Sequence, residues 1–516
     1  MRPRHATITD EIGLTKSFPA DPARFEWAGL PRSPGVPVIF LGLGPEPDAL
    51  PGWFGLSAPD KVFFVENPEF AEQMPNWAGL VPDGFTRLDP AAFTARLAAG
   101  ASVARYLPAQ RAFPSFFAPL SARLALPEAP PRRPGPTAWL PSGETDLLGR
   151  ELSLALARAG YTVRFLDYAP LGRHPGAVLP GLLAEGAPDL FLSVNFKGLD
   201  PHGLGAAILR EAGTRVAIWL VDNPFNQLPA IKSRFWRDTR LFVTDHTFIG
   251  PLVENGARWV SHLPLAACPE LFPGAALPDH GHGLADRLVF VGRSRFPDRD
   301  KFFAGETLPA DAGSGGPDER RDYHWWRKRC PDVPLWPGNA ARRIGAGAEA
   351  SGLEWKRDCL RAAGPVTIFG DGGWREADIG QADLRPFVDY YAHLPAIYRE
   401  SAAVLNVTGM QLPGGLTQRH FDVWSADGFL LTDTHSGLNI FPDELTAPIR
   451  FAAPSEIRPL FERFRDESPE KAALRDAWRA LILREHTYHN RVAAILTALN
   501  LPKPGPAQAK LMKTLV

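Results

Sequence analysis

Short apolar runs alternate with segments of helical spacing along most of the chain. Each run is long enough for one strand, and several end in polar residues. This pattern predicts buried parallel strands with helices between them. A first set begins near residue 136, and a second set begins near residue 285. The runs are TAWL, TVRFLDY, DLFLSVNF, RVAIWLVDNPF and TRLFVTD in the first set, and RLVFVGRS, VTIFGDGGW, AAVLNVT, GFLLTD and IRFAA in the second.

Helix signals separate these runs. Residues 144–161 predict an amphipathic helix with Leu148, Leu152 and Ala155 on one stripe and Gly160 as the C-cap. Near the end of the chain, Ser468 is a candidate N-cap and Pro469 occupies the first helical position of a terminal helical region. The polar stretch from about 304 to 350 breaks the pattern, and we interpret it as an insertion with one helix.

The first 128 residues carry a different pattern. A strand ends at Gly42 and Gly44, and a second strand ends at Glu66. A strand, a glycine turn and an acid about twenty residues later outline a nucleotide-binding βαβ unit. The third glycine of that outline is missing, and Pro45 and Pro47 stand where its helix should begin. Glu66 is equally compatible with an exposed position at a strand end.

We therefore expect an α/β protein with a GT-B-like pair of Rossmann-like domains facing a cleft, and an additional N-terminal α/β domain. The boundaries follow stretches rich in proline and glycine. The expected units are a Rossmann-like accessory domain over 1–128, a Pro-rich linker over 129–136, a first domain over 137–280, a second domain with C-terminal helices over 285–498, and a tail over 499–516.

Composition narrows the classes of function. The 516 residues carry a net charge of −1, so no global field attracts nucleic acid or an anionic membrane. No apolar run approaches twenty residues, so we expect no membrane span, and the N-terminus lacks the apolar segment of a signal peptide. The three cysteines are far apart, which argues against disulfides or structural zinc and favours the cytoplasm.

Ligands of parallel sheets bind at the carboxyl ends of the strands. In the first set these ends hold Asn195 with Lys197, Asp222 with Asn223, and Thr244 with Asp245 and His246. In the second set, PGGLTQRHFDV places two glycines before a helix, where backbone amides and the helix dipole can hold a diphosphate. The alternative is an ordinary glycine turn followed by a helix with an exposed aspartate.

In order and spacing, these pieces resemble the CgeB-type (spore-maturation-protein-like) glycosyltransferases of the GT-B class. The resemblance spans about residues 136–495 and includes AIWLVDNPF, FVGRSRFPDRDKF, FGDGGW, and the segment from VDYYAHLP to GFLLTD. It implies a nucleotide-sugar donor held mainly by the second domain, with no obligatory metal and no cofactor. The sequence agrees on the metal, because it has no Asp-x-Asp at a strand end.

The resemblance also implies site residues. Asp422, one turn into the helix, would accept hydrogen bonds from the ribose hydroxyls, and Arg419 would add a fixed charge. Related enzymes have a second carboxylate eight residues earlier, where this chain has Gly414. If the enzyme inverts, the catalytic base would be Asp222, Asp245 or His246. The family often shows a second acid directly after the position of Asp222, where this chain has Asn223. The expected donor-binding residues are Gly292, Arg293, Gly370, Asp371, Leu394, Gly414, Gly415, Leu416, Thr417, Gln418, Arg419 and Asp422.

The predicted function is transfer of a sugar, of hexosyl type, from a nucleotide-diphosphate sugar to a glycan or protein acceptor, in bacterial glycan biosynthesis. Residues 1–128 could bind a protein partner. One alternative is an epimerase or hydrolase that acts on the nucleotide sugar without an acceptor. The other is a non-catalytic scaffold protein of the same fold.

Overall fold

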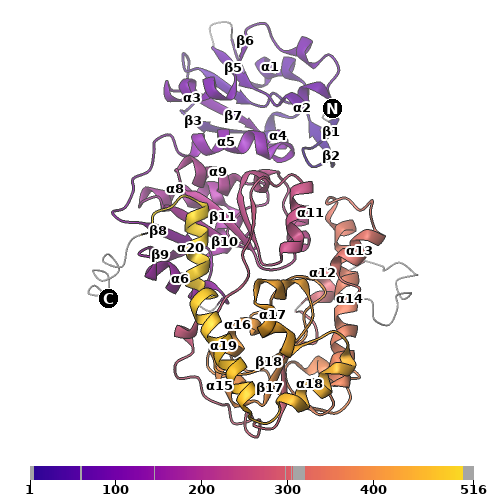
Figure 1. The fold of residues 1–516 in the computed structure, drawn as a ribbon. Helices are drawn as coiled ribbons and strands as arrows, with labels where there is room; N and C mark the ends of the chain where they lie inside the picture. Colours follow the sequence, from indigo (N-terminus) through magenta and orange to yellow (C-terminus); the bar gives the residue numbers. More distant parts are fainter. Residues whose placement is uncertain are drawn as a thin grey trace.

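A computed structural model describes residues 5–57, 61–143, 146–296, 298–303, 305 and 320–503. Three α/β units follow one another in space, with the N-terminal unit at the top of Figure 1 and the unit around β17 and β18 at the bottom. The lower two units are the expected GT-B-like pair of Rossmann-like domains, and the upper unit is the additional α/β domain.

The N-terminal unit is built on a five-stranded sheet in the order β3-β7-β4-β5-β6, in which only β3 is antiparallel to its neighbour. The two apolar runs expected to be strands are β4 and β5, and every residue of both is buried. A separate antiparallel hairpin, β1-β2, precedes the sheet. The strands are β1 (His5–Thr9), β2 (Thr15–Pro19), β3 (Phe25–Gly29), β4 (Val38–Leu41), β5 (Val62–Val65), β6 (Phe85–Arg87) and β7 (Ser102–Tyr106).

The glycine loop after β4 is filled by the protein itself. The Glu66 carboxylate is buried and accepts backbone N–H bonds from Leu43 at 2.8 Å and from Asn67 at 3.0 Å. A Cβ on Gly42 would lie 3.1 Å from the Cβ of Ala109. The Leu43 amide and the space beside Gly42 are therefore both taken up by the protein itself. This geometry gives no support to a nucleotide site in the N-terminal unit.

The middle unit contains a six-stranded parallel sheet in the order β13-β12-β11-β10-β8-β9. Each apolar run of the first set forms one of its strands, and the prolines before 137 lie outside the sheet. The strands are β8 (Thr137–Leu140), β9 (Thr162–Phe165), β10 (Leu190–Val194), β11 (Arg215–Leu220), β12 (Arg240–Val243) and β13 (Val260–His262).

The lower unit repeats this plan with a sheet in the order β16-β15-β14-β17-β18-β19, again all parallel. The apolar runs of the second set form five of its strands. The sixth, β16, has the polar sequence ADLR and lies at the edge of the sheet, so it has no apolar signature. The strands are β14 (Leu288–Val291), β15 (Val366–Phe369), β16 (Ala382–Arg385), β17 (Ala403–Asn406), β18 (Leu430–Asp433) and β19 (Arg450–Phe451).

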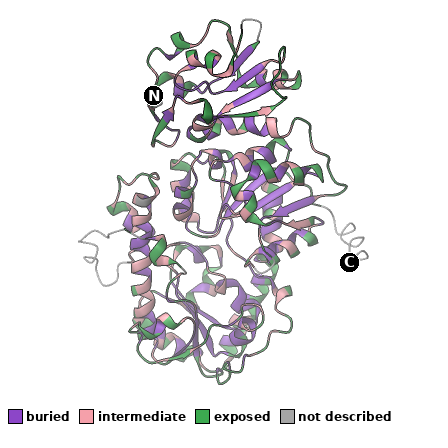
Figure 2. Ribbon diagram, turned by 180° about the vertical axis from the view of Figure 1, so that it is seen from behind, coloured by how far each residue is buried: buried purple, intermediate pink, exposed green. Residues whose placement is uncertain are grey.

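The helices cover both faces of these sheets, and their outward sides carry most of the exposed residues (Figure 2). Ser468 caps α19 by accepting from the Lys471 amide, as expected, and Gly160 has the positive φ of a C-terminal helix stop. The longer helices are α3 (Pro90–Ala98), α5 (Pro114–Ala125), α6 (Gly149–Arg158), α8 (Pro175–Ala184), α9 (Leu204–Glu211), α13 (Tyr323–Arg329), α14 (Gly338–Ala362), α18 (Ile457–Phe464), α19 (Pro469–Glu485) and α20 (Tyr488–Ala498). The shorter ones are α1 (Leu50–Phe54), α2 (Pro68–Glu72), α4 (Leu107–Ala112), α7 (Tyr168–Arg173), α10 (Pro224–Gln227), α11 (Ile249–Glu254), α12 (Arg299–Phe302), α15 (Leu394–Glu400), α16 (Arg419–Ser425) and α17 (Asp443–Thr446).

The expected insertion differs from the prediction. Its described part contains two helices, α13 and α14, rather than one, while residues 304 and 306–319 lie outside the described residues. Helix α14 has 25 residues despite several glycines. A Cβ at Gly347 would lie 2.3 Å from the Trp326 ring, so this glycine allows α13 and α14 to pack closely.

The last helix, α20, returns to the middle unit. Tyr488, Val492 and Ile495 are buried in one cluster with residues of β8, β10 and β11. The sequence grouped this helix with the second domain, whereas its side chains complete the core of the first. Within the described residues, no helix is both long enough and apolar enough to cross a membrane.

Candidate functional site

The carboxyl ends of the two six-stranded sheets face each other. Asp245, after β12, forms an isolated antiparallel bridge with Gly415 of the loop before α16. Asn223, after β11, donates to the backbone oxygen of Gln411 at 3.0 Å. The fold thus brings the two groups of predicted residues to one interdomain surface, where ligands of parallel sheets bind.

Asp222 is the candidate base with an accessible carboxylate. It follows β11, is exposed, and accepts a hydrogen bond from Asn195 Nδ2 at 2.7 Å. Asn195 also accepts from the Val221 amide at 3.0 Å, so its amide group is fixed at the strand end. Desolvation by the surrounding protein raises the pKa of Asp222, against the opposing effects of the Asn195 hydrogen bond and of Lys197. A raised pKa on an oriented carboxylate suits a general base.

Asp245 has a different role. Its Oδ1 accepts from the amide and the hydroxyl of Thr247, at 2.8 and 2.6 Å, and its Oδ2 accepts from the Gly414 amide at 2.9 Å. The residue is buried and both oxygens are engaged. In this structure Asp245 caps a helical turn and joins the two domains, and this geometry does not support the predicted role as a base. His246 lies beside it, with its ring 5.5 Å from that of His262.

The two glycines of the PGG turn are required by this contact. A Cβ on Gly414 would lie 2.8 Å from Asp245 Oδ1 and 2.9 Å from His246 Cε1. A Cβ on Gly415 would lie 2.8 Å from the Cβ of Leu412. The lack of side chains at these glycines therefore allows the two domains to approach each other closely. A diphosphate was expected at this same point.

The next three residues also have partners inside the protein. Leu416 is buried in the core of the lower unit. The Thr417 amide donates to His420 Nδ1 at 3.0 Å, so a histidine side chain holds the loop directly before α16. Gln418 Nε2 donates to the Ala266 backbone oxygen at 2.6 Å, which is a second link to the middle unit.

Arg419 lies beneath the loop. Its Nε donates to Asn406 Oδ1 at 2.9 Å, and its Nη1 donates to the Val291 backbone oxygen at 2.6 Å. Burial lowers the pKa of Arg419. The guanidinium therefore joins the carboxyl ends of β14 and β17 and places a positive charge below the cleft surface.

Asp422 is buried one turn further along α16. Its Oδ2 accepts from the Tyr390 hydroxyl, and its Oδ1 accepts from Gln418 Nε2 at 3.0 Å. Burial and, to a smaller extent, nearby Glu151 raise the pKa of Asp422 to about 7, against the opposing effect of these two hydrogen bonds. A ribose could reach this carboxylate only by displacing Tyr390 or Gln418. In this structure Asp422 is therefore not open to the predicted contact with a ribose.

The loops after β14 and β15 line a cavity of about 770 Å³. Arg293 lines it, is exposed, and stacks over Phe387 at 5.4 Å. Asp371 also lines it, but its carboxylate accepts from the amide and hydroxyl of Ser294 and from the Gly373 amide. Within the described residues, Arg293 makes no ion pair or hydrogen bond, so its charge is available to a ligand.

The remaining predicted residues support this wall structurally. A Cβ on Gly370 would lie 2.5 Å from the Gly292 backbone oxygen, so both glycines allow the strand ends to pack together. That oxygen also accepts from Trp374 Nε1 at 2.9 Å. Leu394 is buried at the start of α15, in the core of the lower unit.

Two charged residues that sequence reasoning did not single out lie close to the cleft. Lys356 of α14 is half-buried, and desolvation and the neighbouring Arg419 lower its pKa, against the opposing effects of Glu349 and Asp371. It makes no hydrogen bond or ion pair with other described residues. Glu151 of α6 is buried, and its Oε1 accepts from the Tyr391 hydroxyl across the interface at 2.9 Å. Neither residue belongs to a motif, and only packing brings them to the site.

A comparison with known protein families gives one match, which lies mostly in the lower unit. Residues 353–497 match a family model described as glycosyl transferase-like. Among curated protein sequences, none matches the chain.

Three solved structures are similar over most of this chain. The E. coli structure described as trehalose-6-phosphate bound with UDP-2-fluoro glucose has 14% identity and a TM-score of 0.36, and covers 71% of this chain and 100% of its own. T4 phage BGT in complex with UDP-glucose has 10% identity and a TM-score of 0.38, covering 71% and 99%. An alpha-glucosyltransferase in complex with UDP-glucose and DNA has 10% identity and a TM-score of 0.42, covering 71% and 99%.

Proposed function

We propose that the protein is a glycosyltransferase that moves a sugar from a nucleotide-diphosphate sugar to a hydroxyl acceptor, without a required metal. The observation that carries this proposal is the facing of two sheet edges, with an exposed, hydrogen-bonded carboxylate on one and, among the described residues, cations without ion pairs on the other. The glycosyl transferase-like match over 353–497 supports the same reaction class. Within that class we favour a CgeB-type hexosyltransferase.

In this proposal Asp222 accepts the proton of the acceptor hydroxyl. The acceptor oxygen forms a bond to the anomeric carbon, and the bond between that carbon and the diphosphate oxygen breaks. The electron pair leaves with the nucleoside diphosphate. Asn195 holds the carboxylate in place by its 2.7 Å hydrogen bond, so the base is oriented before the acceptor arrives.

Arg293 and Lys356 would stabilise the leaving diphosphate. The first is exposed at the 770 Å³ cavity, and the second is a half-buried cation beside Arg419. Lys356 and Arg419 repel each other, and an anion beside them would relieve this repulsion. Preorganised positive charge around a departing diphosphate can replace a metal ion.

The test is calorimetric titration with UDP, GDP, ADP, dTDP and CMP, without metal and then with Mg²⁺. We expect one nucleotide to bind without metal, and Lys356→Met to weaken it roughly tenfold or more, as for a charged hydrogen bond of about 1.5–3 kcal/mol. Lys328→Met, at an exposed position of α13, is the matched control. Donor turnover without any acceptor would instead indicate a hydrolase or epimerase, and binding of no nucleotide would favour a scaffold.

A further inference from the structure

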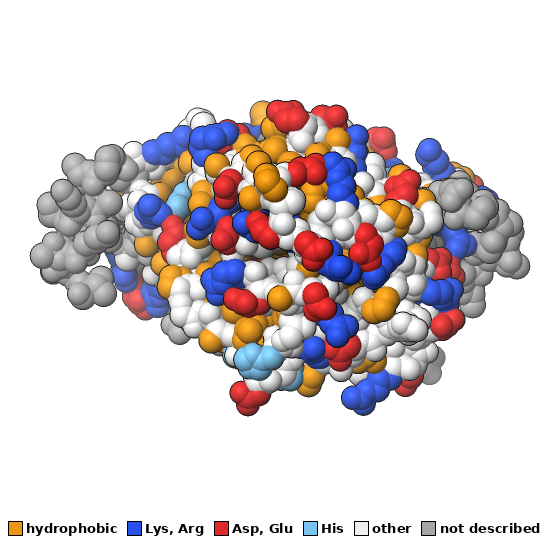
Figure 3. Space-filling model, turned by 60° about the horizontal axis from the view of Figure 1, so that its bottom comes forward, with side chains coloured by type: hydrophobic (Ala, Val, Ile, Leu, Met, Phe, Trp, Pro, Cys, Tyr) orange, Lys and Arg blue, Asp and Glu red, His pale blue; other side chains and the backbone are white. Residues whose placement is uncertain are grey.

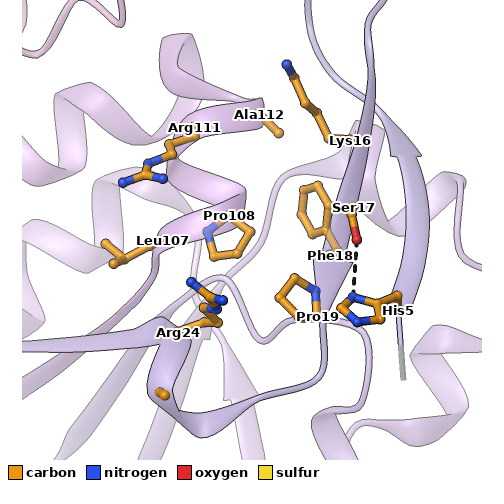
Figure 4. A pocket seen from close by; sticks show the side chains of 11 residues that line it. His5, Lys16, Ser17, Phe18, Pro19, Arg24, Leu107, Pro108, Arg111 and Ala112 are labelled. Atoms are coloured by element: carbon orange, nitrogen blue, oxygen red, sulfur yellow. Dashed lines mark hydrogen bonds between the residues drawn. The ribbon is translucent and has the colours of Figure 1, made fainter. Parts of the chain in front are cut away.

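We infer that the N-terminal unit holds a second binding site, for a small phosphorylated or sulfated molecule, separate from the interdomain cleft. The site is a cavity of about 400 Å³ between the β1-β2 hairpin and α4. Figure 4 shows His5 and Lys16 on the paired strands, with Arg24 and Arg111 on the helical segments opposite. The inference does not depend on the proposed transferase activity.

The lining has one sign of charge. Its described residues include Lys16, Arg24, Arg111 and His5, and none of them is Asp or Glu. The whole chain has 56 basic and 57 acidic residues, so a lining with basic residues alone departs from the average. On the face drawn in Figure 3, by contrast, positive and negative side chains are interspersed.

The cations of this cavity are weakly neutralised by the protein. Lys16 is 3.6 Å from Asp10, and Arg24 is 3.8 Å from Asp21, and both distances are longer than a hydrogen bond. Within the part of the chain that the structure describes, Arg111 has no ion pair and no hydrogen bond. Lys16 and Arg24 thus form ion pairs without a hydrogen bond, Arg111 forms none, and no acid is among the described lining residues, so the hollow favours an anion.

The same charges reach the neighbouring unit. Burial is the main cause that lowers the pKa of His202, and the positive charges of Arg111, Lys16 and Lys232 lower it further, against the opposing effect of Asp200. His202 lies in the middle unit, and its Nδ1 is buried without a hydrogen-bond partner among the described residues. The positive potential therefore extends from the cavity to the junction of the two units.

The shape of the cavity selects among anions. A volume of about 400 Å³ is at the lower end of the range for small-molecule sites and exceeds what one phosphate fills. Pro19, Leu107 and Pro108 supply apolar walls, and Phe18 is fully buried, so its ring offers no stacking surface for a base. These features fit a phosphate or sulfate ester on a non-aromatic body the size of a monosaccharide.

An adjoining cavity of about 720 Å³ differs from the first in the charges of its lining. It shares Leu107 and Arg111 with the first cavity, but Glu26 and Asp200 are also part of its lining. Its cations are therefore offset by carboxylates nearby. Of these two cavities, the one beside the β1-β2 hairpin has basic residues and no acid among its described lining residues.

The experiment is calorimetric titration of the full chain with ribose 5-phosphate, ribose and inorganic phosphate. We expect saturable binding of ribose 5-phosphate, at least tenfold tighter than that of inorganic phosphate, and no binding of ribose. Arg111→Ala and Lys16→Ala should each weaken binding at least fivefold. Lys61→Ala, which removes an exposed lysine of the same unit, should leave it unchanged.

Four results would overturn the inference. They are the absence of binding, equal weakening by Lys61→Ala, competition between ribose 5-phosphate and the nucleotide bound in the cleft, and equal affinities for inorganic phosphate and the sugar phosphate. Thermal unfolding of each variant, together with its nucleotide affinity, verifies that loss of binding is not loss of folding.

Discussion

Asp222 and Asp245 follow adjacent strands and look alike in the sequence, yet the protein uses them differently. Asp245 has three donors within 2.9 Å and is buried, so it holds the two domains together. Asp222 has one side-chain donor among the described residues and is exposed. What separates a base from a structural acid here is the number of hydrogen bonds each carboxylate already accepts.

Asp222→Asn should therefore abolish most of the transferase activity. We expect kcat to fall 10²–10⁴-fold, as for loss of a general base, with little change in donor KM. In the wild type, kcat/KM should fall as pH drops through the raised pKa of Asp222, because the base must be ionised. The control is Asp167→Asn, at the end of the edge strand β9, where the aspartate caps α7. Equal losses in both variants would contradict the assignment.

Asp422→Asn should change how stability depends on pH. The pKa of Asp422 is about 7 when folded and 3.8 ordinarily, so between these values only the folded state keeps the proton. The contribution of this group to stability is complete below about pH 4 and declines until about pH 7. Asparagine mimics the protonated form, so the variant should gain thermal stability relative to wild type at pH 8 compared with pH 5. A difference in Tm that is the same at both pH values would contradict this.

At the scale of elements, the apolar runs were sufficient to locate most strands. Four consecutive apolar residues, as in β4 and β14, are the pattern expected of a fully buried strand. The polar edge strand β16 and the glycine-containing helix α14 were not predicted, because contacts with other segments decide their conformation. Gly347 is an example, since its neighbour Trp326 lies 21 residues away in the sequence.

Only the place of the predicted residues in the fold was predictable. Most of them follow the carboxyl ends of strands, whereas Leu394 begins α15 and Asp422 lies within α16. Their partners were not predictable, because no local pattern shows that Tyr390 reaches Asp422, or that Ser294 reaches Asp371. The site residues remain a proposal, and Lys356 joins them only because α14 passes beside the sheet.

The PGG turn gives a test at this scale. Gly414→Ala would place a Cβ 2.8 Å from Asp245, so we expect the free energy of unfolding to fall by about 1–3 kcal/mol, as in overpacked cores. Gly409→Ala is the control, because a Cβ there meets nothing within 4 Å. Denaturant titration of both variants measures the difference. If Gly414→Ala is as stable as the control, the two domains do not pack this closely in solution.

At the scale of the molecule, Gln411 is one of the side chains that connect the two Rossmann-like domains. It accepts from Asn223 and Asn226 of the middle unit at 3.2 and 3.1 Å, and donates to the Gly345 backbone oxygen of α14 at 2.7 Å. Gln411→Ala should weaken this link and increase the radius of gyration measured by X-ray scattering without nucleotide. Gln381→Ala, at an exposed position, should not. Unchanged scattering in Gln411→Ala would show that other contacts suffice.

The return of α20 to the middle unit has a consequence for synthesis. The last strand of that unit ends at His262, but the helix that seals its core begins at Tyr488. A ribosome must translate the entire lower unit in between, which takes on the order of ten seconds or more at 5–20 residues per second. During that interval Trp219 and its neighbours lack their final cover, and the nascent chain presents an apolar surface to chaperones. The upper unit, which is complete by about residue 125, has no such wait.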